Sequence, residues 1–353
     1  MLKTKLKTAI SAAFGVALAA SASNVTAAQQ WSMATSWGGG PFLEEDAKGF
    51  ARLVEQLTAG RIKIQVFPGG TLGKALKVSD TVKSNVAQVG HSWMGYDWGI
   101  DKATVVFSGM AGGLNPEELM LWLYQGGGAE LTHQYRMEKF GVASVTCGVF
   151  PTEIFLHSKK KIQTVADFQG LKMRTAGAWA EIAGSMGAST IILPGAEVYP
   201  ALERGVIDAT EWSSPSVNLP SGFHKIAKYI ITPGVHQPGA VQECVVNKEV
   251  WEGLSEGDRE LIKLAGRLNT LDSWGRYAYR DIAALAEMRK AGNEFVQLSP
   301  EFIKAAAEAS AKWSDAQAAD NEWFKKALDH RRAFQKSMEE TWSFFRFPTG
   351  MPR

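Results

Sequence analysis

Residues 171–212 read LKMRTAGAWAEIAGSMGASTIILPGAEVYPALERGVIDATEW, and this stretch decides the fold. Its pattern predicts a strand at Lys172–Arg174, a helix at Trp179–Met186, a helix at Tyr199–Arg204 and a strand around Asp208–Thr210. Short strands that alternate with helical segments are typical of α/β folds, in which helices pack against a sheet. The stretch therefore predicts an α/β module.

The chain before this module shows the same alternation. Its predicted elements are strands at Trp31–Ser36, Ile62–Phe67 and Ala143–Phe150, helices at Phe42–Thr58 and Val78–Asn85, and a long helical region at Glu117–Phe140 that Gly126, Gly127 and Gly128 interrupt. After the module, Val241–Asn247 is another β-rich run, and the chain from Ser255 onward is almost entirely helical, with a pair of long helices expected over Asp281–Ala318. The chain is thus expected to form one α/β unit, then a second, and then to contribute a further strand to the first.

Such a path predicts an α/β fold with two lobes, strands that cross the hinge and long C-terminal helices. We assign residues 29–150 and 244–254 to lobe I, and residues 151–243 to lobe II. Residues 255–353 are expected to form helices that brace both lobes. The crevice between two lobes of this kind is where a ligand binds.

The N-terminal residues 1–28 have the pattern of a secretory signal peptide. Lys3, Lys5 and Lys7 precede a short apolar run, Ala9–Ala20, and small residues follow it up to Ala28. The run is too short to cross a bilayer as a helix, and the small residues suit cleavage. We therefore expect export to the periplasm.

Composition excludes several classes of function. The chain is 45% hydrophobic and 21% charged with a formal net charge of +2, and it has no basic tract interleaved with aromatic residues. Nucleic acid is therefore not an expected partner.

The two cysteines, Cys147 and Cys244, would lie in an oxidising compartment but sit in apolar, strand-like segments, so a disulfide and two buried thiols both remain open.

The sequence motifs that mark common enzyme classes are incomplete or absent, so no catalytic residue is assigned. Gly69, Gly73 and Lys74 resemble a phosphate-binding loop, but the spacing is one residue short and Ala75 replaces the required Ser or Thr. No Gly-x-Ser-x-Gly motif is present. The histidines show no paired metal-ligand spacing, and most are expected to be structural or to lie at the surface.

Five strings together carry a resemblance to a known family. They are FPGGTLG at 67–73, WLYQGGG at 122–128, LKMR at 171–174, DATEW at 208–212 and PGVHQPG at 233–239. The chain resembles the substrate-binding subunit of tripartite ATP-independent periplasmic (TRAP) transporters, in the subgroup that binds 2-oxo and 2-hydroxy monocarboxylates. The resemblance implies the two-lobed periplasmic binding protein fold and a receptor that is not an enzyme.

The resemblance also implies ligand contacts. Arg174 would pair with the substrate carboxylate, and a planar guanidinium suits this role because it can donate two parallel hydrogen bonds. The carboxylate of Glu211 and the backbone carbonyl of Trp212 would bind a metal ion that also touches the substrate. The third protein ligand of the family is typically a glutamine, and the matching position here is Glu153, which is either a metal ligand or a carboxylate at the rim that faces solvent.

That departure bears on the identity of the metal. Glu153, Glu211, a substrate anion and Arg174 sum to two negative charges, whereas a glutamine would leave one. Because an uncompensated buried charge is unfavourable by several kcal/mol, we expect calcium, with sodium as the alternative. A protonated Glu153 would remove this argument.

The remaining pocket wall is expected to be aromatic. Candidates are Trp37, Trp93 and Tyr96 in the first lobe and Phe150, Trp179 and Trp212 in the second. Asn218 is a weaker candidate for a ligand contact, and both Asn218 and Glu243 are candidates to support the residues that contact the ligand.

These expectations define a periplasmic solute-binding protein that delivers a small organic acid to integral-membrane TRAP transporter subunits. Two alternatives remain open: a ligand-sensing partner of a membrane receptor, and a TRAP receptor for a larger aromatic or branched acid. The long C-terminal helices also permit a homodimer.

Overall fold

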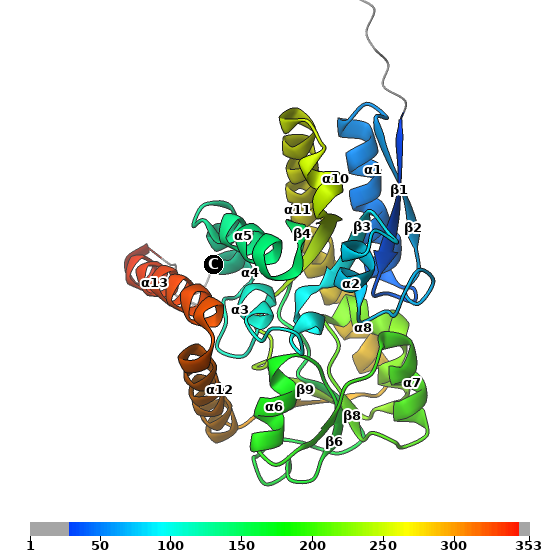
Figure 1. The fold of residues 1–353 in the computed structure, drawn as a ribbon. Coiled ribbons are helices and arrows are strands. Elements are labelled where there is room, and N and C mark those ends of the chain that lie inside the picture. Colours follow the sequence, from blue (N-terminus) through cyan, green and yellow to red (C-terminus); the bar gives the residue numbers. More distant parts are fainter. Residues whose placement is uncertain (1–27, 346–353) are drawn as a thin grey trace, which may run out of the picture.

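The computed structural model describes residues 28–345, which form two sheets surrounded by helices (Figure 1). All but the last residue of the predicted signal peptide lies outside the described residues. The first sheet has the order β2-β1-β3-β10-β4 and the second the order β11-β9-β5-β8-β6-β7. The two-lobed α/β arrangement predicted from the sequence is therefore confirmed.

The first sheet mixes parallel and antiparallel pairs. Its strands are β1 (Gln29–Thr35), β2 (Ile62–Phe67), β3 (Val89–Trp93), β4 (Val142–Phe150) and β10 (Ala240–Asn247). Strand β1 is parallel to β2 and β3, whereas β10 is antiparallel to β3 and β4. Every residue of β4 and β10 is buried, as expected for strands with both faces covered.

Helices cover this sheet. They are α1 (Lys48–Leu57), which follows the short π-helix η1 (Phe42–Ala47), α2 (Val78–Lys83), α3 (Thr104–Ser108), α4 (Pro116–Tyr124), α5 (Gly128–Phe140) and α10 (Lys248–Glu252); a 3₁₀ turn, η2 (Met94–Asp97), follows β3. The long helical region is broken at Gly127, whose φ of 81° is readily adopted by glycine and lets α5 start in a new direction.

The second sheet takes three of its six strands, β6, β7 and β8, from the stretch quoted first. Its strands are β5 (Leu156–Ser158), β6 (Lys172–Arg174), β7 (Ser189–Ile191), β8 (Ala209–Thr210), β9 (Tyr229–Thr232) and β11 (Glu294–Gln297). Its helices are α6 (Ala178–Ser185), α7 (Gly195–Glu203), α8 (Pro215–Ser221) and α9 (Phe223–Ile226). Strand β6 lies between β7 and β8 and is parallel to both. The C-terminal ends of β6 and β8, at Arg174 and Thr210, therefore lie side by side at one edge of the sheet.

The structure differs from the expected lobe boundary at β10. All eight residues of this strand, Ala240–Asn247, pair within the first sheet, although residues up to 243 were assigned to lobe II. The reason is that Ala240 already pairs with Phe150, so the crossing back to the first sheet takes place before β10 begins.

The C-terminal region also differs in detail. It forms α11 (Glu256–Lys290), α12 (Pro300–Asp320) and α13 (Glu322–Phe345), but β11 lies between the first two helices, where continuous helix was expected. Strand β11 pairs in parallel with β9, so the chain returns to the second sheet after α11.

Helix α11 ties the two sheets together. It packs on β4 and α1 of the first lobe and on α8 of the second. Near its C-terminal end, Asp281 accepts hydrogen bonds at Oδ1 from the backbone N of Ser216 (2.7 Å) and from Oγ of Ser214 (3.1 Å) at the start of α8. A carboxylate at a helix N-terminus is stabilising, so this contact fixes α8 to α11.

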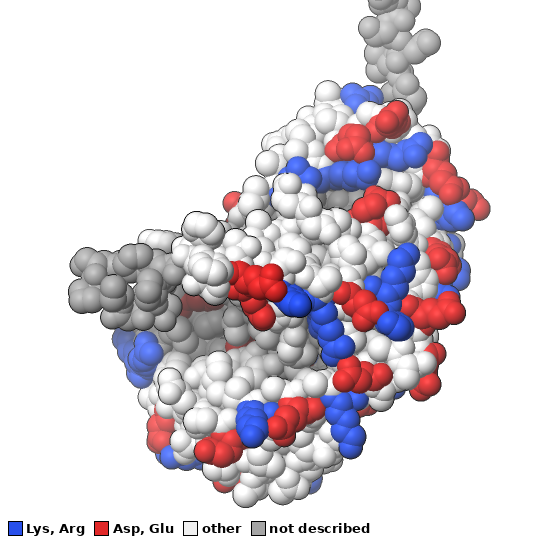
Figure 2. Space-filling view, turned by 90° about the vertical axis from the view of Figure 1, so that its left-hand side faces the viewer, with Lys and Arg blue, Asp and Glu red and all other residues white. Residues whose placement is uncertain are grey.

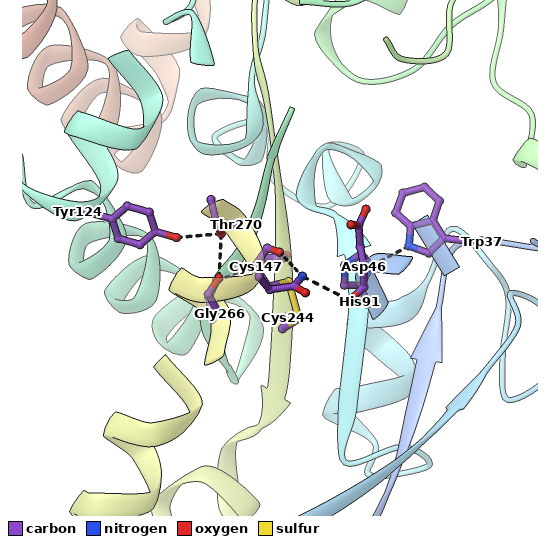
Figure 3. The surroundings of a disulfide bond; sticks show 11 residues. Trp37, Asp46, His91, Tyr124, Cys147, Cys244, Gly266 and Thr270 are labelled. Atoms are coloured by element: carbon purple, nitrogen blue, oxygen red, sulfur yellow. Dashed lines mark hydrogen bonds between the residues drawn. A yellow bond between two sulfur atoms is a disulfide. The ribbon is translucent and has the colours of Figure 1, made fainter. Parts of the chain in front are cut away.

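A disulfide joins Cys147 of β4 to Cys244 of β10 (Figure 3). The sequence left open whether these cysteines are bridged, and the structure has the bridge. Asn269 of α11 donates to the carbonyl of Cys147 at 2.8 Å, and Nε1 of Trp37 donates to Nδ1 of His91 at 2.7 Å nearby. The bridge therefore lies between the long helix and one wall of the cavity described next.

Candidate functional site

A cavity lies between the two sheets and takes residues from both. Its volume is about 50 Å³. On the same measure, one buried water needs roughly 10–15 Å³. The space therefore suits a small molecule of a few heavy atoms. The lining residues are Trp37, Phe42, Trp93, Tyr96, Gly109, Met110, Phe150, Glu153, Arg174, Ala176, Ala178, Trp179, Glu211, Trp212, Ser213, His236, Gln237, Ala240 and Gln242.

Arg174 ends β6 and is 2% exposed. Its Nη1 donates to Oε1 of Glu211 at 2.9 Å, its Nε donates to the carbonyl of Leu193 at 3.2 Å, and its guanidinium stacks 5.0 Å from the ring of Trp212. Its Nη2 is buried and has no hydrogen-bond partner among the described residues. A buried donor without an acceptor is unfavourable, so Nη2 is a group that a ligand oxygen would satisfy.

Two carboxylates and an imidazole lie beside Arg174. Ligand atoms of Glu153, Glu211 and His236 all lie within 4.8 Å of one another, and Oε2 of Glu153 is 3.0 Å from Nε2 of His236. Burial raises the pKa of Glu153 well above its usual value, while Arg174 acts in the opposite direction. Burial also raises the pKa of Glu211, again against the effect of Arg174. Both carboxylates therefore lack sufficient positive charge around them.

This donor set fits a hard cation. Calcium binds carboxylate and carbonyl oxygens at about 2.3–2.6 Å, so two ligand atoms on one ion can lie up to about 5 Å apart. The separations of Glu153 and Glu211 are within that limit. A cation would also supply the positive charge that the two buried carboxylates lack. Glu153 and Glu211 are thus groups that would hold it, and the carbonyl of Trp212 stays a predicted ligand.

Sequence reasoning missed His236. Its ring is 3% exposed and packs on Phe155 and Trp179, and burial lowers its pKa to about 4, so it is neutral at pH 7. Its partner Glu153 is 83 residues away in the chain, so no local spacing could reveal the pair. The PGVHQPG string was the one available signal.

The aromatic wall contains the predicted residues and one more. Trp37, two residues after β1, packs on Phe42 with ring centroids 4.7 Å apart, and Phe42 packs on Phe150 at 5.0 Å. Trp93 and Tyr96 pack edge to face at 5.3 Å. The structure therefore brings these predicted aromatic residues together around the cavity and adds Phe42 from the π-helix η1.

Two predicted residues lie elsewhere. Asn218 was expected near the ligand, but its Nδ2 contacts Nε2 of His157 at 3.0 Å and the carbonyl of Ser213 at 2.8 Å, outside the cavity. Glu243 points away from the cavity and forms an ion pair of 2.9 Å with buried Arg136. The assignment of Asn218 as a ligand contact is therefore corrected, because its amide is used within the second lobe.

The described residues contain no helix long and apolar enough to cross a membrane. On the face shown in Figure 2, acidic and basic side chains are interspersed and do not form a field of one sign.

Known proteins match this chain over most of its length. Residues 33–321 match the family described as bacterial extracellular solute-binding protein, family 7. A monocarboxylate 2-oxoacid-binding periplasmic protein of a Nostoc species is 32% identical over 311 residues, covering 88% of this chain and 85% of the relative.

Two solved structures extend the comparison. A TRAP transporter solute-binding protein from Bordetella bronchiseptica, a dimer with copurified calcium and picolinate in one of its sites, has a TM-score of 0.87 and 26% identity, with 90% of this chain and 95% of that chain covered. A TRAP periplasmic solute-binding protein from Pseudoalteromonas atlantica, with bound sodium and pyruvate, has a TM-score of 0.85 and 29% identity over 90% and 97% of the chains. The chain therefore belongs to the bacterial extracellular solute-binding proteins of family 7 and is a periplasmic receptor of the TRAP type, not an enzyme.

Proposed function

We propose that this receptor binds a small 2-oxo or 2-hydroxy monocarboxylate together with a cation in the cavity around Arg174, and delivers the acid to integral-membrane TRAP transporter subunits. The observation that carries the proposal is the buried Nη2 of Arg174, which has no protein acceptor among the described residues. Nε1 of Trp179, which also lines the cavity, is likewise buried without an acceptor. Two such donors suit the two oxygens of a carboxylate.

The charges in the cavity favour calcium over sodium. Burial favours the protonated forms of Glu153 and Glu211, and a bound cation would favour their ionised forms. With the cation bound, Arg174 contributes one positive charge, and Glu153, Glu211 and the acid contribute three negative charges. The sum of minus two is neutralised by one divalent ion and only half neutralised by sodium. Since an uncompensated buried charge is unfavourable by several kcal/mol, we expect the acid and calcium to bind together.

The second candidate function is a TRAP receptor for a larger, aromatic acid, and it differs from the first in the size of the acid that the cavity must hold. The aromatic wall of Trp37, Phe42, Trp93 and Phe150 also suits a planar ring. The Bordetella bronchiseptica protein was solved with picolinate, a ring acid, and the Pseudoalteromonas atlantica protein with pyruvate. The cavity of about 50 Å³ favours the smaller acid. A sensor for a membrane receptor would use the same cavity, and genes for two membrane subunits beside this one would favour transport.

The experiment is a binding screen on protein that has been dialysed against chelator. Pyruvate, lactate, 2-oxobutanoate and picolinate are added with calcium or with sodium, and the melting temperature and the radius from small-angle scattering are measured. A ligand at a hundredfold excess over its Kd stabilises the fold by about 2.7 kcal/mol. If no monocarboxylate changes either quantity, the proposed substrate class is wrong. Mass spectrometry of ligand released from freshly purified protein would identify the acid.

A homodimer is a further part of the proposal. Leu264, Leu268, Leu271, Tyr279 and Ile282 are 39–78% exposed, and at 100° per residue they lie on one face of α11. An exposed apolar stripe on a long helix is typical of a protein interface, and the Bordetella bronchiseptica protein is described as a dimer. Sedimentation should show a dimer that Leu271→Glu dissociates, whereas Glu287→Lys, on another side of the helix, should not. A monomeric wild-type protein would contradict this part alone.

A further inference from the structure

The cavity contains one polar side chain from the first sheet that the proposed carboxylate and cation do not use. Gln242 of β10 is 2% exposed and lines the cavity, and its Oε1 is buried without a hydrogen-bond partner. This buried oxygen is an acceptor, so it requires a hydrogen-bond donor. A buried amide in this state is unfavourable unless a ligand or water supplies the missing partner.

The backbone directs this side chain into the cavity. The register of β10 against β4 shifts between Gln242 and Glu243, since Gln242 pairs with Gly148 and Glu243 with Thr146. Bulges of this kind change the direction of side chains and are frequent beside binding sites. The extra residue, Cys147, lies on β4, so β10 keeps the alternation of a regular strand: Ala240 and Gln242 face the cavity, and Glu243 is bonded to Arg136 on the other side.

The opposing glycine leaves room for this arrangement. A Cβ atom at Gly148 would lie 2.8 Å from the ring of Phe150 and 3.5 Å from Cβ of Gln242. The space beside Gln242 is therefore shared with an aromatic ring, and a side chain at residue 148 would displace that ring.

The two ends of the cavity differ in chemistry. Arg174, Glu153 and Glu211 lie at the end formed by the second lobe, whereas Gln242 stands with Trp93 and Phe150 on strands of the first sheet. Arg174 is the only Lys or Arg among the described residues that line the cavity, and Glu211 already shares it. A neutral amide can donate and accept hydrogen bonds but cannot compensate a charge.

We infer that Gln242 binds an uncharged hydrogen-bond donor, such as a hydroxyl, on the side chain of the bound acid. The inference rests on the proposed function and narrows it: the preferred ligand is a monocarboxylate with a polar, uncharged tail. Sites built to hydrogen-bond a ligand group discriminate strongly against analogues that lack it, because the protein group is then left unpaired.

The test uses acids of equal size that differ only in the tail. Hydroxypyruvate is compared with 2-oxobutanoate, and 4-hydroxy-2-oxobutanoate with 2-oxopentanoate, by titration calorimetry in calcium. Wild-type protein should prefer the hydroxy acid in at least one pair by roughly five- to hundredfold. Gln242→Leu should abolish or invert that preference and should still bind the alkyl acids.

The control is Gln237→Leu, which changes the other amide that lines the cavity. It should leave the preference intact. Equal affinities within both pairs in the wild type, or a preference that Gln237→Leu removes and Gln242→Leu does not, would overturn the inference while leaving the proposed function standing. Failure of the wild type to bind any of the four acids would overturn both.

Discussion

Arg174 donates a hydrogen bond of 2.9 Å from Nη1 to Oε1 of Glu211, so the group proposed to bind the acid directly contacts a group proposed to bind the cation. Both side chains are buried. A change of charge at one of these side chains therefore changes the electrostatic potential at the other. The acid and the cation should consequently not bind independently.

Arg174→Met should abolish acid binding, because it removes the one permanent positive charge among the lining residues described here. Arg174→Lys should weaken binding at least tenfold, since an ammonium keeps the charge but loses the planar pair of donors. Titration calorimetry measures both, and the melting temperature of each variant shows whether it is folded. Unchanged affinity in folded Arg174→Met protein would move the carboxylate site elsewhere.

Removing the cation should weaken acid binding, and calcium should restore it better than sodium. If the ion touches both carboxylates and the acid, the two ligands stabilise each other reciprocally. In Glu153→Gln the preference should shift toward sodium, because one negative charge is lost while an oxygen ligand remains. Calorimetric titrations of the acid in each ion test this. Ion dependence that is identical in wild type and Glu153→Gln would retain Glu211 and reject the assignment of Glu153.

The disulfide should contribute strongly to stability. Its two cysteines are 97 residues apart, and closing a loop of about 100 residues in the unfolded chain is worth up to about 4.7 kcal/mol in the chain-entropy model. The double variant Cys147→Ala/Cys244→Ala should therefore unfold at a lower urea concentration, and wild type in reductant should approach it. Equal urea midpoints for oxidised wild type and the double variant would contradict the expected contribution.

Asp46 should make stability depend on pH near neutrality. Burial raises its pKa from 3.8 to about 7, although its bonds to Tyr277 and Arg276 act in the opposite direction. Because the folded-state pKa is the higher one, its contribution to stability is complete below about pH 4 and is lost as the pH rises through about 7. The loss is roughly 4 kcal/mol as an upper bound.

Urea denaturation of wild type and Asp46→Asn between pH 5 and pH 8 measures this effect. The difference in unfolding free energy should change across the range in favour of the variant at high pH. Asp258→Asn is the control, because the hydrogen bond from Arg61 lowers the pKa of Asp258 and its titration lies below this range. A pH-independent difference for Asp46→Asn would show that its carboxyl titrates normally.

The elements that the sequence predicted well are those whose pattern is local. Strand β4 is rich in valine and other residues that favour strands, and α5 begins where three glycines end the preceding helix. Strand β11 has only four residues, with Glu294 and Gln297 exposed, so its own pattern does not distinguish it from a turn between helices. Its conformation depends on pairing with β9, which lies more than 60 residues earlier.

The same limit applies to the site. Arg174 and Glu211 were found because their strings match a known family, and Glu153 because the interval from Arg174 is fixed in that family. His236 and Gln242 had no such signal: His236 depends on a partner 83 residues away, and Gln242 depends on which face of β10 borders the cavity, which the pairing of β10 with β3 and β4 decides. Asn218 was placed wrongly because its sequence position beside the site does not reveal that its amide contacts His157.

The cavity takes its walls from two sheets, and this has a consequence for how the receptor communicates. An acid that contacts both walls holds them at a fixed separation, so occupancy of the interior is expressed in the relative orientation of the two outer surfaces. A partner that touches only those surfaces can distinguish a loaded receptor from an empty one without reaching the acid. The membrane subunits would thus recognise a loaded receptor by the relative orientation of its two lobes, and this signal would be the same for every acid that holds the lobes in that orientation.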